Sequence, residues 1–315
     1  MIATAPGKLI LTGEYAVLDG APALVTAVDR RAVARHGVAR GSSPFLIAVA
    51  TELAERRGST DPAARAALEV SVESTAFYDR QTKLGLGSSS AVTVAATACA
   101  LGEAGLVIDR EEILAVASAA HARAQGARGA IGSGADIAAA VYGGTIAFTK
   151  KKIEHRKWPA QVTLIPFFTG HAADTSTLVQ QVAAARVARK TEVDAALVAV
   201  ADASQAACLA VVAPSELASA AMIAALSLAG HAIDRLAQAT GVVLVPGCVT
   251  TARAAMARFG GTAKTTGAGG GDVAVAVLPA TANVTEATRA LIEMGCLPLR
   301  LSVDETGVDT RPDAQ

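Results

Sequence analysis

KLGLGSSSAVTVAATA, residues 83–98, places a glycine- and serine-rich loop directly before an apolar run of helical character. Gly85 and Gly87 leave the backbone bare, so successive N–H groups there can converge on an anion. The helix behind the loop adds unpaired N–H donors and about half a positive charge at its N-terminus. The stretch favours binding of nucleotide phosphates, and a serine hydroxyl can also bind Mg²⁺. It matches neither the P-loop nor the dinucleotide GxGxxG pattern. A serine-capped helix after a tight turn is the alternative.

A second glycine-rich loop lies at TTGAGGGDVAV, residues 265–275. Four of the five residues at 267–271 are glycine. So many glycines would cost chain entropy unless the backbone needed unusual φ angles or a close approach to another group. A hairpin turn is the alternative. Because one loop precedes a helix and the other a strand, the pair favours a shared nucleotide site over two unrelated turns.

Two further stretches each place one charged residue at the start of a predicted element. In APGKLILTGEYAVLDG, residues 5–20, Lys8 opens a strand with its stem packed and its ammonium at one end. In GSGADIAAAVYGG, residues 132–144, Asp136 begins an otherwise apolar helix. The structural alternatives are a surface cation for Lys8 and a first-turn acid stabilised by the helix dipole for Asp136.

The composition of the 315-residue chain excludes several classes of protein. Hydrophobic residues make up 52% and charged residues 18%, so the chain buries a sizeable core and is not disordered. A net charge of zero and 3% aromatic residues argue against a nucleic-acid binder with a broad basic face or stacking platforms. No uninterrupted apolar run reaches about 18 residues, and the N-terminus does not resemble a secretory signal. The four cysteines form no CxxC pair. We expect a reduced, cytoplasmic protein with neither nucleic acid nor membrane as a partner.

Strands and helices alternate in both halves of the sequence, which predicts an α+β protein with a domain boundary near 150–165. The basic run 150–152 predicts a solvated turn, and the polar tail 304–315 predicts a frayed end. Strands are expected at 8–18, 22–28, 31–38, 68–76, 144–149, 162–168, 273–278 and 297–303. Helices are expected at 43–57, 91–103, 110–125, from 135, over most of 174–258 and near 281–294.

Taken together and in order, the four stretches resemble the motifs of the GHMP kinase superfamily. Its PGKxxLxGEY motif is similar to residues 6–15, its GLGSSA motif to residues 85–91, and its GAGGGD motif to residues 267–272. Three motifs in this order and at these spacings are highly specific. The resemblance covers most of the chain, from Ala5 to about Val277.

This resemblance implies a two-lobed α+β fold with the active site in the cleft between the lobes. Residues 1–160 would form the N-terminal ATP-binding domain. Residues 161–315 would form an Ala-rich helical and ferredoxin-like C-terminal domain. The implied activity is phosphoryl transfer with ATP and Mg²⁺ as cofactors, on a small-molecule substrate, by a monomer or homodimer.

Within the superfamily the chain resembles the phosphomevalonate kinases most. Gln125 stands where mevalonate kinases carry a Glu used as a magnesium ligand, and its spacing to Asp136 fits that alignment. The other segments that carry this resemblance are Phe77-Tyr78, His121, residues 132–144 and Lys264. The implied reaction is phosphorylation of (R)-5-phosphomevalonate to the 5-diphosphate in isoprenoid biosynthesis. Mevalonate kinase is the main alternative. Mevalonate-diphosphate decarboxylase, a non-catalytic ligand sensor, and homoserine and sugar kinases are weaker alternatives.

The superfamily's mechanism implies a role for each candidate site residue. Lys8 and Asp136 are expected to be catalytic, with Asp136 facing the acceptor and the γ-phosphate and Lys8 beside both. Ser89 is the expected Mg²⁺ ligand. The residues expected to bind ATP are Lys83, Gly85, Leu86, Gly87, Ser88, Ser89 and Ser90. The residues expected to bind the acceptor are Lys8, Tyr15, Ser133, Asp136, His171, Asp174, Thr175, Gly269 and Gly270.

One stretch, TGHAADT at residues 169–175, departs from the TGxxAST stretch that phosphomevalonate kinases tend to carry. A carboxylate at Asp174 would repel a substrate phosphate if it faced one, unless His171 or a Lys or Arg side chain offsets it. The alternative is that Asp174 caps a helix that begins at Thr175. The sequence leaves both interpretations open.

Overall fold

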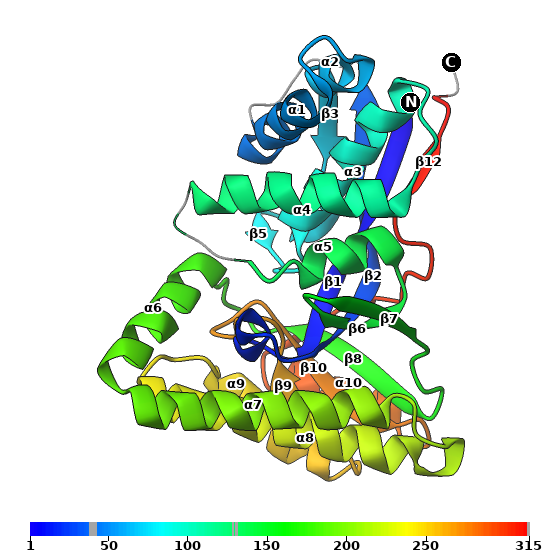
Figure 1. The fold of residues 1–315 in the computed structure, drawn as a ribbon. Helices are drawn as coiled ribbons and strands as arrows, with labels where there is room; N and C mark the ends of the chain where they lie inside the picture. The colour runs from blue at the N-terminus through cyan, green and yellow to red at the C-terminus, as the bar shows by residue number, and fades with distance from the viewer. Residues whose placement is uncertain (38–42, 128, 130–131, 314–315) are drawn as a thin grey trace.

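The computed structural model describes residues 1–37, 43–127, 129 and 132–313, which form two β-sheets with helices packed on each (Figure 1). The strand order of the first sheet is β12-β1-β2-β6-β7, with β3 also paired to β2. The order of the second sheet is β11-β8-β10-β9. A small ribbon joins β4 (Tyr78–Asp79) and β5 (Thr82–Lys83). The α+β prediction is confirmed, whereas the division into residues 1–160 and 161–315 stays a prediction.

The first sheet is built on two long antiparallel strands, β1 (Ile2–Thr12) and β2 (Ala23–His36). The prediction of two strands at 22–28 and 31–38 is wrong, because Asp29 and Arg30 form a bulge within one continuous strand: Pro6 pairs with Arg31 and Gly7 with Val28. The remaining strands are β3 (Val70–Glu73), β6 (Thr145–Thr149), β7 (Lys152–Arg156) and β12 (Asp309–Arg311).

The end of the chain is part of this sheet. β12 pairs with the beginning of β1, so that residues 309–311 lie beside the N-terminal strand at one end of the sheet (Figure 1). The prediction of a frayed tail over 304–315 is therefore wrong for 309–311, because these residues find backbone partners on an open strand edge. The predicted turn at 150–152 is confirmed for Lys150 and Lys151, which are exposed at the tip of the β6–β7 hairpin, whereas Lys152 begins β7.

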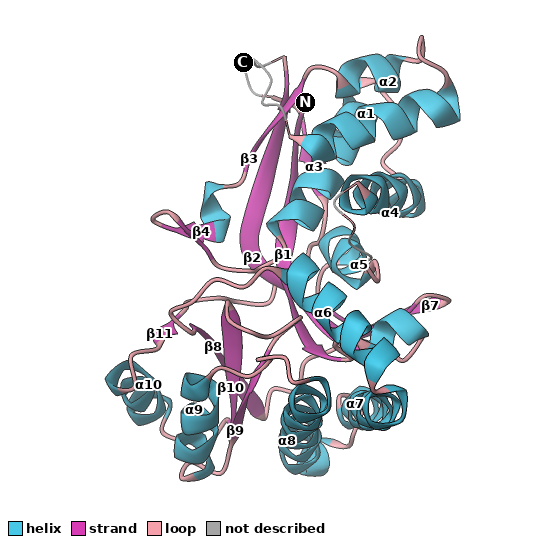
Figure 2. Cartoon of the chain, turned by 90° about the vertical axis from the view of Figure 1, so that its left-hand side faces the viewer, coloured by secondary structure: helices cyan, strands magenta, loops and turns pink. Residues whose placement is uncertain are grey.

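Five helices cover one side of the first sheet (Figure 2). They are α1 (Pro44–Arg57), α2 (Pro62–Ala67), α3 (Ser88–Glu103), α4 (Arg110–Gly126) and α5 (Ala135–Tyr142). Helix α3 is buried along almost its whole length, because its Ala, Ser, Thr and Gly side chains allow a close approach to β1 and β2. It begins three residues before the predicted start at Ala91, directly after Gly87, whose left-handed backbone ends the glycine loop.

The second sheet consists of β8 (Val162–Phe168), β9 (Thr262–Thr265), β10 (Val273–Pro279) and β11 (Leu297–Pro298). The helices around it are α6 (Thr175–Ala188), α7 (Lys190–Ala210), α8 (Ser215–Thr240), α9 (Gly247–Ala257) and α10 (Val284–Glu293). The sequence did not predict α2, β7 or β9, which are short or weakly patterned.

Helices α7 and α8 are long and apolar enough to span a membrane by length and composition alone. They pack against each other, and α8 also packs on β9 and β10 of the second sheet. In their most apolar windows 50% and 44% of the residues are buried within the fold. They are core helices of this fold, and Ser204 of α7 hydrogen-bonds to Thr12 at the end of β1 across 2.9 Å.

Candidate functional site

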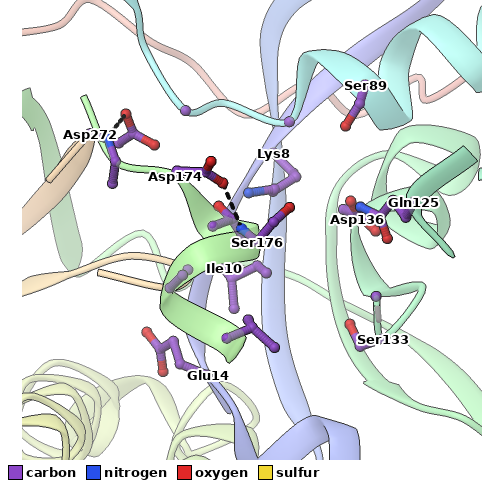
Figure 3. Close-up of a pocket in the computed structure, with 18 of the residues that line it drawn as sticks. Lys8, Ile10, Glu14, Ser89, Gln125, Ser133, Asp136, Asp174, Ser176 and Asp272 are labelled. Carbon is purple, nitrogen blue, oxygen red and sulfur yellow. Dashed lines mark hydrogen bonds between the residues drawn. The ribbon is translucent and has the colours of Figure 1, made fainter. Parts of the chain in front are cut away.

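A cavity of about 350 Å³ lies where β1, the loop before α3, the start of α5, the start of α6 and the loop after β9 converge (Figure 3). It brings together most of the residues that the sequence singled out. Those that line it are Lys8, Tyr15, Lys83, Gly85, Gly87, Ser88, Ser89, Ser133, Asp136, Asp174 and Thr175. Leu86, Ser90, His171, Gly269 and Gly270 are not among the lining residues.

The glycine–serine loop forms one wall of the cavity. Gly85 and Gly87 have φ angles of 72° and 79°, which favour glycine. Leu86 is buried behind the loop, and its carbonyl oxygen accepts a 2.8 Å hydrogen bond from the backbone N–H of Lys8. Ser90 is also buried, and its hydroxyl donates to the carbonyl of Gly87 across 2.7 Å. The side chains of Leu86 and Ser90 therefore shape the loop from behind.

The N-terminus of α3 opens toward the cavity through Ser88 and Ser89. No side chain among the described residues caps this end of the helix. The first N–H groups of a helix have no partner within it, and with the helix dipole they form a site for anions. The arrangement suits phosphate groups, as the sequence predicts.

Lys8 lies in the middle of β1, between two acidic residues from separate parts of the chain. Its stem packs on the glycine loop, since a Cβ atom placed on Gly87 would lie 2.9 Å from Lys8 Cε. Burial lowers the pKa of Lys8, and the negative charges of Asp136 and then Asp272 oppose this effect. Lys8 is thus a half-buried ammonium at the cavity wall, and the neighbouring carboxylates stabilise its charge.

Asp136 faces the cavity from the first turn of α5. The helix starts after Gly134, which has a φ of 85°, and Asp136 Oδ1 accepts a 3.0 Å hydrogen bond from the N–H of Ile137. Ser133 Oγ accepts a hydrogen bond from the N–H of Ala135 across 3.2 Å. Figure 3 shows Asp136 on one side of Lys8 and Asp174 on the other. The predicted proximity of Lys8 and Asp136 agrees with this geometry.

Asp272 also lines the cavity, and the sequence analysis gave it no role beyond ending the third motif. Its backbone has a φ of 52°, rare for a residue other than glycine, and its Oδ1 accepts a 3.1 Å hydrogen bond from the N–H of Ala173. A Cβ atom on Gly85 would lie 2.3 Å from Asp272 Oδ2, so the two glycine-rich loops touch here. Burial raises the pKa of Asp272, while the Ala173 N–H and the Lys8 charge oppose the rise.

Asp174 both caps a helix and lines the cavity. Its Oδ1 accepts hydrogen bonds from the N–H groups of Ser176 at 2.9 Å and Thr177 at 3.4 Å, the first turn of α6. The capping interpretation is therefore confirmed, and the carboxylate is at the same time part of the cavity wall. His171 is exposed and outside the lining. The structure does not bring it to the cavity to offset Asp174.

Three predicted acceptor-binding residues are engaged in contacts within the protein. The hydroxyl of Tyr15 donates to the carbonyl of Ala268 across 2.6 Å, and burial raises the pKa of this tyrosine. The N–H of Gly270 donates to the carbonyl of Leu244 across 2.7 Å. A Cβ atom on Gly269 would lie 2.3 Å from the same carbonyl oxygen. Gly269 and Gly270 thus pack the third motif onto the chain before α9, and their predicted contact with the acceptor stays a prediction.

Two neutral side-chain oxygens, of residues that line the cavity, are of the kind that Mg²⁺ accepts as ligands. Ser89 Oγ lies 3.2 Å from Nε2 of His121, a buried histidine that stacks on Phe45. Gln125 Oε1 is buried without a hydrogen-bond partner among the described residues, and it lies close to Gly132. The described residues hold no cluster of three or more His, Cys, Asp or Glu side chains suited to a metal. Phosphate oxygens of a nucleotide would therefore supply the charge that these two side chains lack.

Several known proteins are similar to this chain. Residues 44–144 match the family model of the GHMP kinases N terminal domain. The chain is 27% identical to a phosphomevalonate kinase of Streptomyces sp. (strain CL190), across 96% of this chain and 97% of that protein. It is 30% identical to a mevalonate kinase of Archaeoglobus fulgidus, across 62% of this chain and 67% of that protein.

Two solved structures share the fold over nearly their whole length. The Lin0012 protein of Listeria innocua has a TM-score of 0.81 at 20% identity, covering 98% of this chain and 99% of that one. The phosphomevalonate kinase of Streptococcus pneumoniae, in complex with phosphomevalonate and AMPPNP, has a TM-score of 0.78 at 18% identity. It covers 96% of this chain and 99% of the pneumococcal chain. At sequence identities of 20% and 18%, the structural similarity shows that these proteins share the fold of this chain.

The lowered pKa of Lys8 predicts how the catalytic rate depends on pH. We expect kcat/KM to fall as pH rises through this pKa, which lies below the ordinary lysine value of 10.5, because the free enzyme then loses the ammonium charge. Asp272→Asn removes a charge that raises the Lys8 pKa, so the alkaline limb should move to lower pH. Asp174→Asn is the matched control, since Asp174 does not contribute to the shift. Profiles of kcat/KM against pH test this, and an unmoved limb in Asp272→Asn would contradict it.

Proposed function

Because the chain belongs to the GHMP kinase family of ATP-dependent phosphotransferases, we propose that it phosphorylates (R)-5-phosphomevalonate with ATP and Mg²⁺. The products are the 5-diphosphate and ADP. The observation that carries this proposal is the single cavity that joins the uncapped start of α3 to the Lys8 and Asp136 side chains. The similarity to a phosphomevalonate kinase along nearly the whole chain supports this acceptor.

The nucleotide side of the cavity consists of the glycine–serine loop, the start of α3 and Lys83. The backbone N–H groups of this loop hold the phosphates of ATP, and the Lys83 ammonium adds a positive charge at the cavity wall. Ser89, together with Gln125, would hold Mg²⁺, which would supply positive charge to balance the phosphates of ATP. The absence of a Cβ atom at Gly85 and Gly87 lets the Asp272 and Lys8 side chains pack directly against this loop.

Lys8 and Asp136 act on the reacting groups. The phosphate oxygen of the acceptor is already anionic near neutral pH, so the reaction needs little general base. Asp136 then orients the acceptor, and the Lys8 ammonium relieves the repulsion between the acceptor and the γ-phosphate.

Phosphorylation of mevalonate itself is the second candidate, because Asp174 places a carboxylate in the cavity wall. Two like charges about 4 Å apart repel by about 4 kcal/mol at an effective dielectric constant of 20. A hydroxyl acceptor avoids this repulsion. With such an acceptor Asp136 would work as a true general base.

A coupled assay for ADP release discriminates these candidates. We expect kcat/KM for 5-phosphomevalonate to exceed that for mevalonate by about tenfold or more, equivalent to about 1.4 kcal/mol. Mevalonate diphosphate serves as a third substrate, and Asp136→Asn as the inactive control. Equal or faster turnover of mevalonate would overturn the proposed acceptor. Absence of ADP release with all three compounds would overturn the proposed reaction.

The role of Asp174 in acceptor choice is tested by Asp174→Ser and Asp174→Asn. Both replacements remain good helix caps, so the melting temperature should change little. Both remove the negative charge, so we expect KM for 5-phosphomevalonate to fall about three- to tenfold while KM for mevalonate stays the same. Steady-state kinetics with both acceptors provide the measurement. If both KM values stay unchanged, Asp174 is a cap that does not act on the acceptor.

A further inference from the structure

Lys264 and Glu14 form an ion pair in which neither side chain is exposed to solvent. Lys264 Nζ lies 2.5 Å from Glu14 Oε1, and both side chains have an exposed fraction of 0%. The Lys264 ammonium also donates to the carbonyl oxygen of Thr265. The two residues are 250 positions apart in the sequence. Lys264 lies on β9, just before the third motif, and Glu14 belongs to the first.

Glu14 sits in a turn with an uncommon backbone. Gly13 before it has a φ of 92° and Tyr15 after it has a φ of 62°. A left-handed conformation costs a residue other than glycine about 1–2 kcal/mol, so the surrounding structure must hold it in place. Two side chains do so: Glu14 pairs with Lys264, and the Tyr15 hydroxyl donates to Ala268. Both anchors lead to the same segment, residues 264–268.

This turn forms part of the cavity wall, the part that would hold the acceptor in the proposed reaction. Glu14, Tyr15, Val17 and Leu18 line the cavity together with Lys8 and Ile10 of β1. The N–H of Gly267 donates to the carbonyl of Ile10 across 3.3 Å, which adds a backbone tie between the same two segments. The distance between Lys8 and the third motif therefore depends on how firmly the turn is held.

The charges of the pair are costly to bury. Burial raises the pKa of Glu14, and Lys264 is the largest influence that opposes the rise. Glu14 Oε2 has no hydrogen-bond partner among the described residues, so the carboxylate relies on Lys264. Apolar residues of similar volume often stabilise a fold as well as a buried ion pair does. We therefore assign this ion pair the role of fixing the position of Glu14, rather than that of raising the free energy of unfolding.

We propose that Lys264 is a positioning residue for phosphoryl transfer. Through Glu14 it fixes the turn at Gly13–Tyr15 against residues 264–268 and so sets the acceptor side of the cavity relative to Lys8. This inference rests on the proposed function for the reaction it serves. Lys264 is not among the lining residues of the cavity, so it acts on the acceptor indirectly, through Glu14.

The test compares Lys264→Met with the double variant Glu14→Gln/Lys264→Met. Lys264→Met leaves the Glu14 carboxylate buried without a counter-charge, so the melting temperature should fall, and the double variant should recover much of it. We expect kcat/KM for the acceptor to fall about 100-fold in both variants, because a shift of about 1 Å can cost that much. The Kd for AMPPNP should stay within about threefold of the wild type, since the Lys264 ammonium bonds to Glu14 and Thr265 rather than to the loop before α3. If the double variant regains both stability and kcat/KM, the positioning role is refuted.

Arg253→Met/Asp234→Asn provides a matched control. Arg253 pairs with Asp234 and donates to the carbonyl of Ala263, next to Lys264, but neither residue lines the cavity. Cutting this pair should lower the melting temperature and leave kcat/KM within about twofold, as expected for a change away from the site. A loss of kcat/KM as large as that in Lys264→Met would show that any damage near β9 has this effect, and would refute a specific role.

Hydrogen exchange without substrates separates this inference from the proposed function. In Lys264→Met the amides of residues 13–18 and 265–268 should lose protection together, whereas the Arg253→Met/Asp234→Asn control should retain it. Unchanged protection in Lys264→Met would refute the positioning role of Lys264, whatever the acceptor is. A wild-type enzyme that turns over no acceptor would refute the proposed function, and the exchange result would still test the positioning role.

Discussion

The pairing of the Lys8 ammonium with two carboxylates is the constraint on which the site depends. A half-buried cation is stabilised by nearby negative charge, and Asp136 and Asp272 supply it from α5 and from the loop after β9. Both segments must therefore meet β1 at the level of Lys8. The glycine loop must also pass within contact of the same stem, which Gly87 allows. The motifs converge at Lys8 because its ammonium lies beside two carboxylates and its stem packs on the glycine loop.

Charge balance links this constraint to the choice of acceptor. The Glu14–Lys264 pair neutralises itself within the wall of the cavity. Asp136, Asp174 and Asp272 then face Lys8 and Lys83 around the remaining space. A phosphorylated acceptor and the phosphates of ATP would both add negative charge to this space. Asp174 therefore bears directly on the acceptor, although the same carboxylate caps α6.

Local signals in the sequence predicted the parts of the site that depend on local geometry. Gly85 and Gly87 before an apolar helix, and Asp136 at a helix start, could be recognised without tertiary contacts. The importance of Glu14 and Asp272 could not, because their partners Lys264 and Ala173 lie far away in the sequence. The same limit explains the errors in the fold: the bulge in β2 and the pairing of β12 depend on β1 as a partner.

A double-mutant cycle on Lys8→Met and Asp136→Asn tests the central claim, that these two charges form one catalytic unit in the cavity. Each single variant should stay folded and lose about 10²–10³ or more in kcat, because each removes a preorganised charge at the reacting group. The double variant should lose little more than the worse single variant. Losses in kcat that multiply fully in the double variant would contradict the account, since they would show that Lys8 and Asp136 act independently.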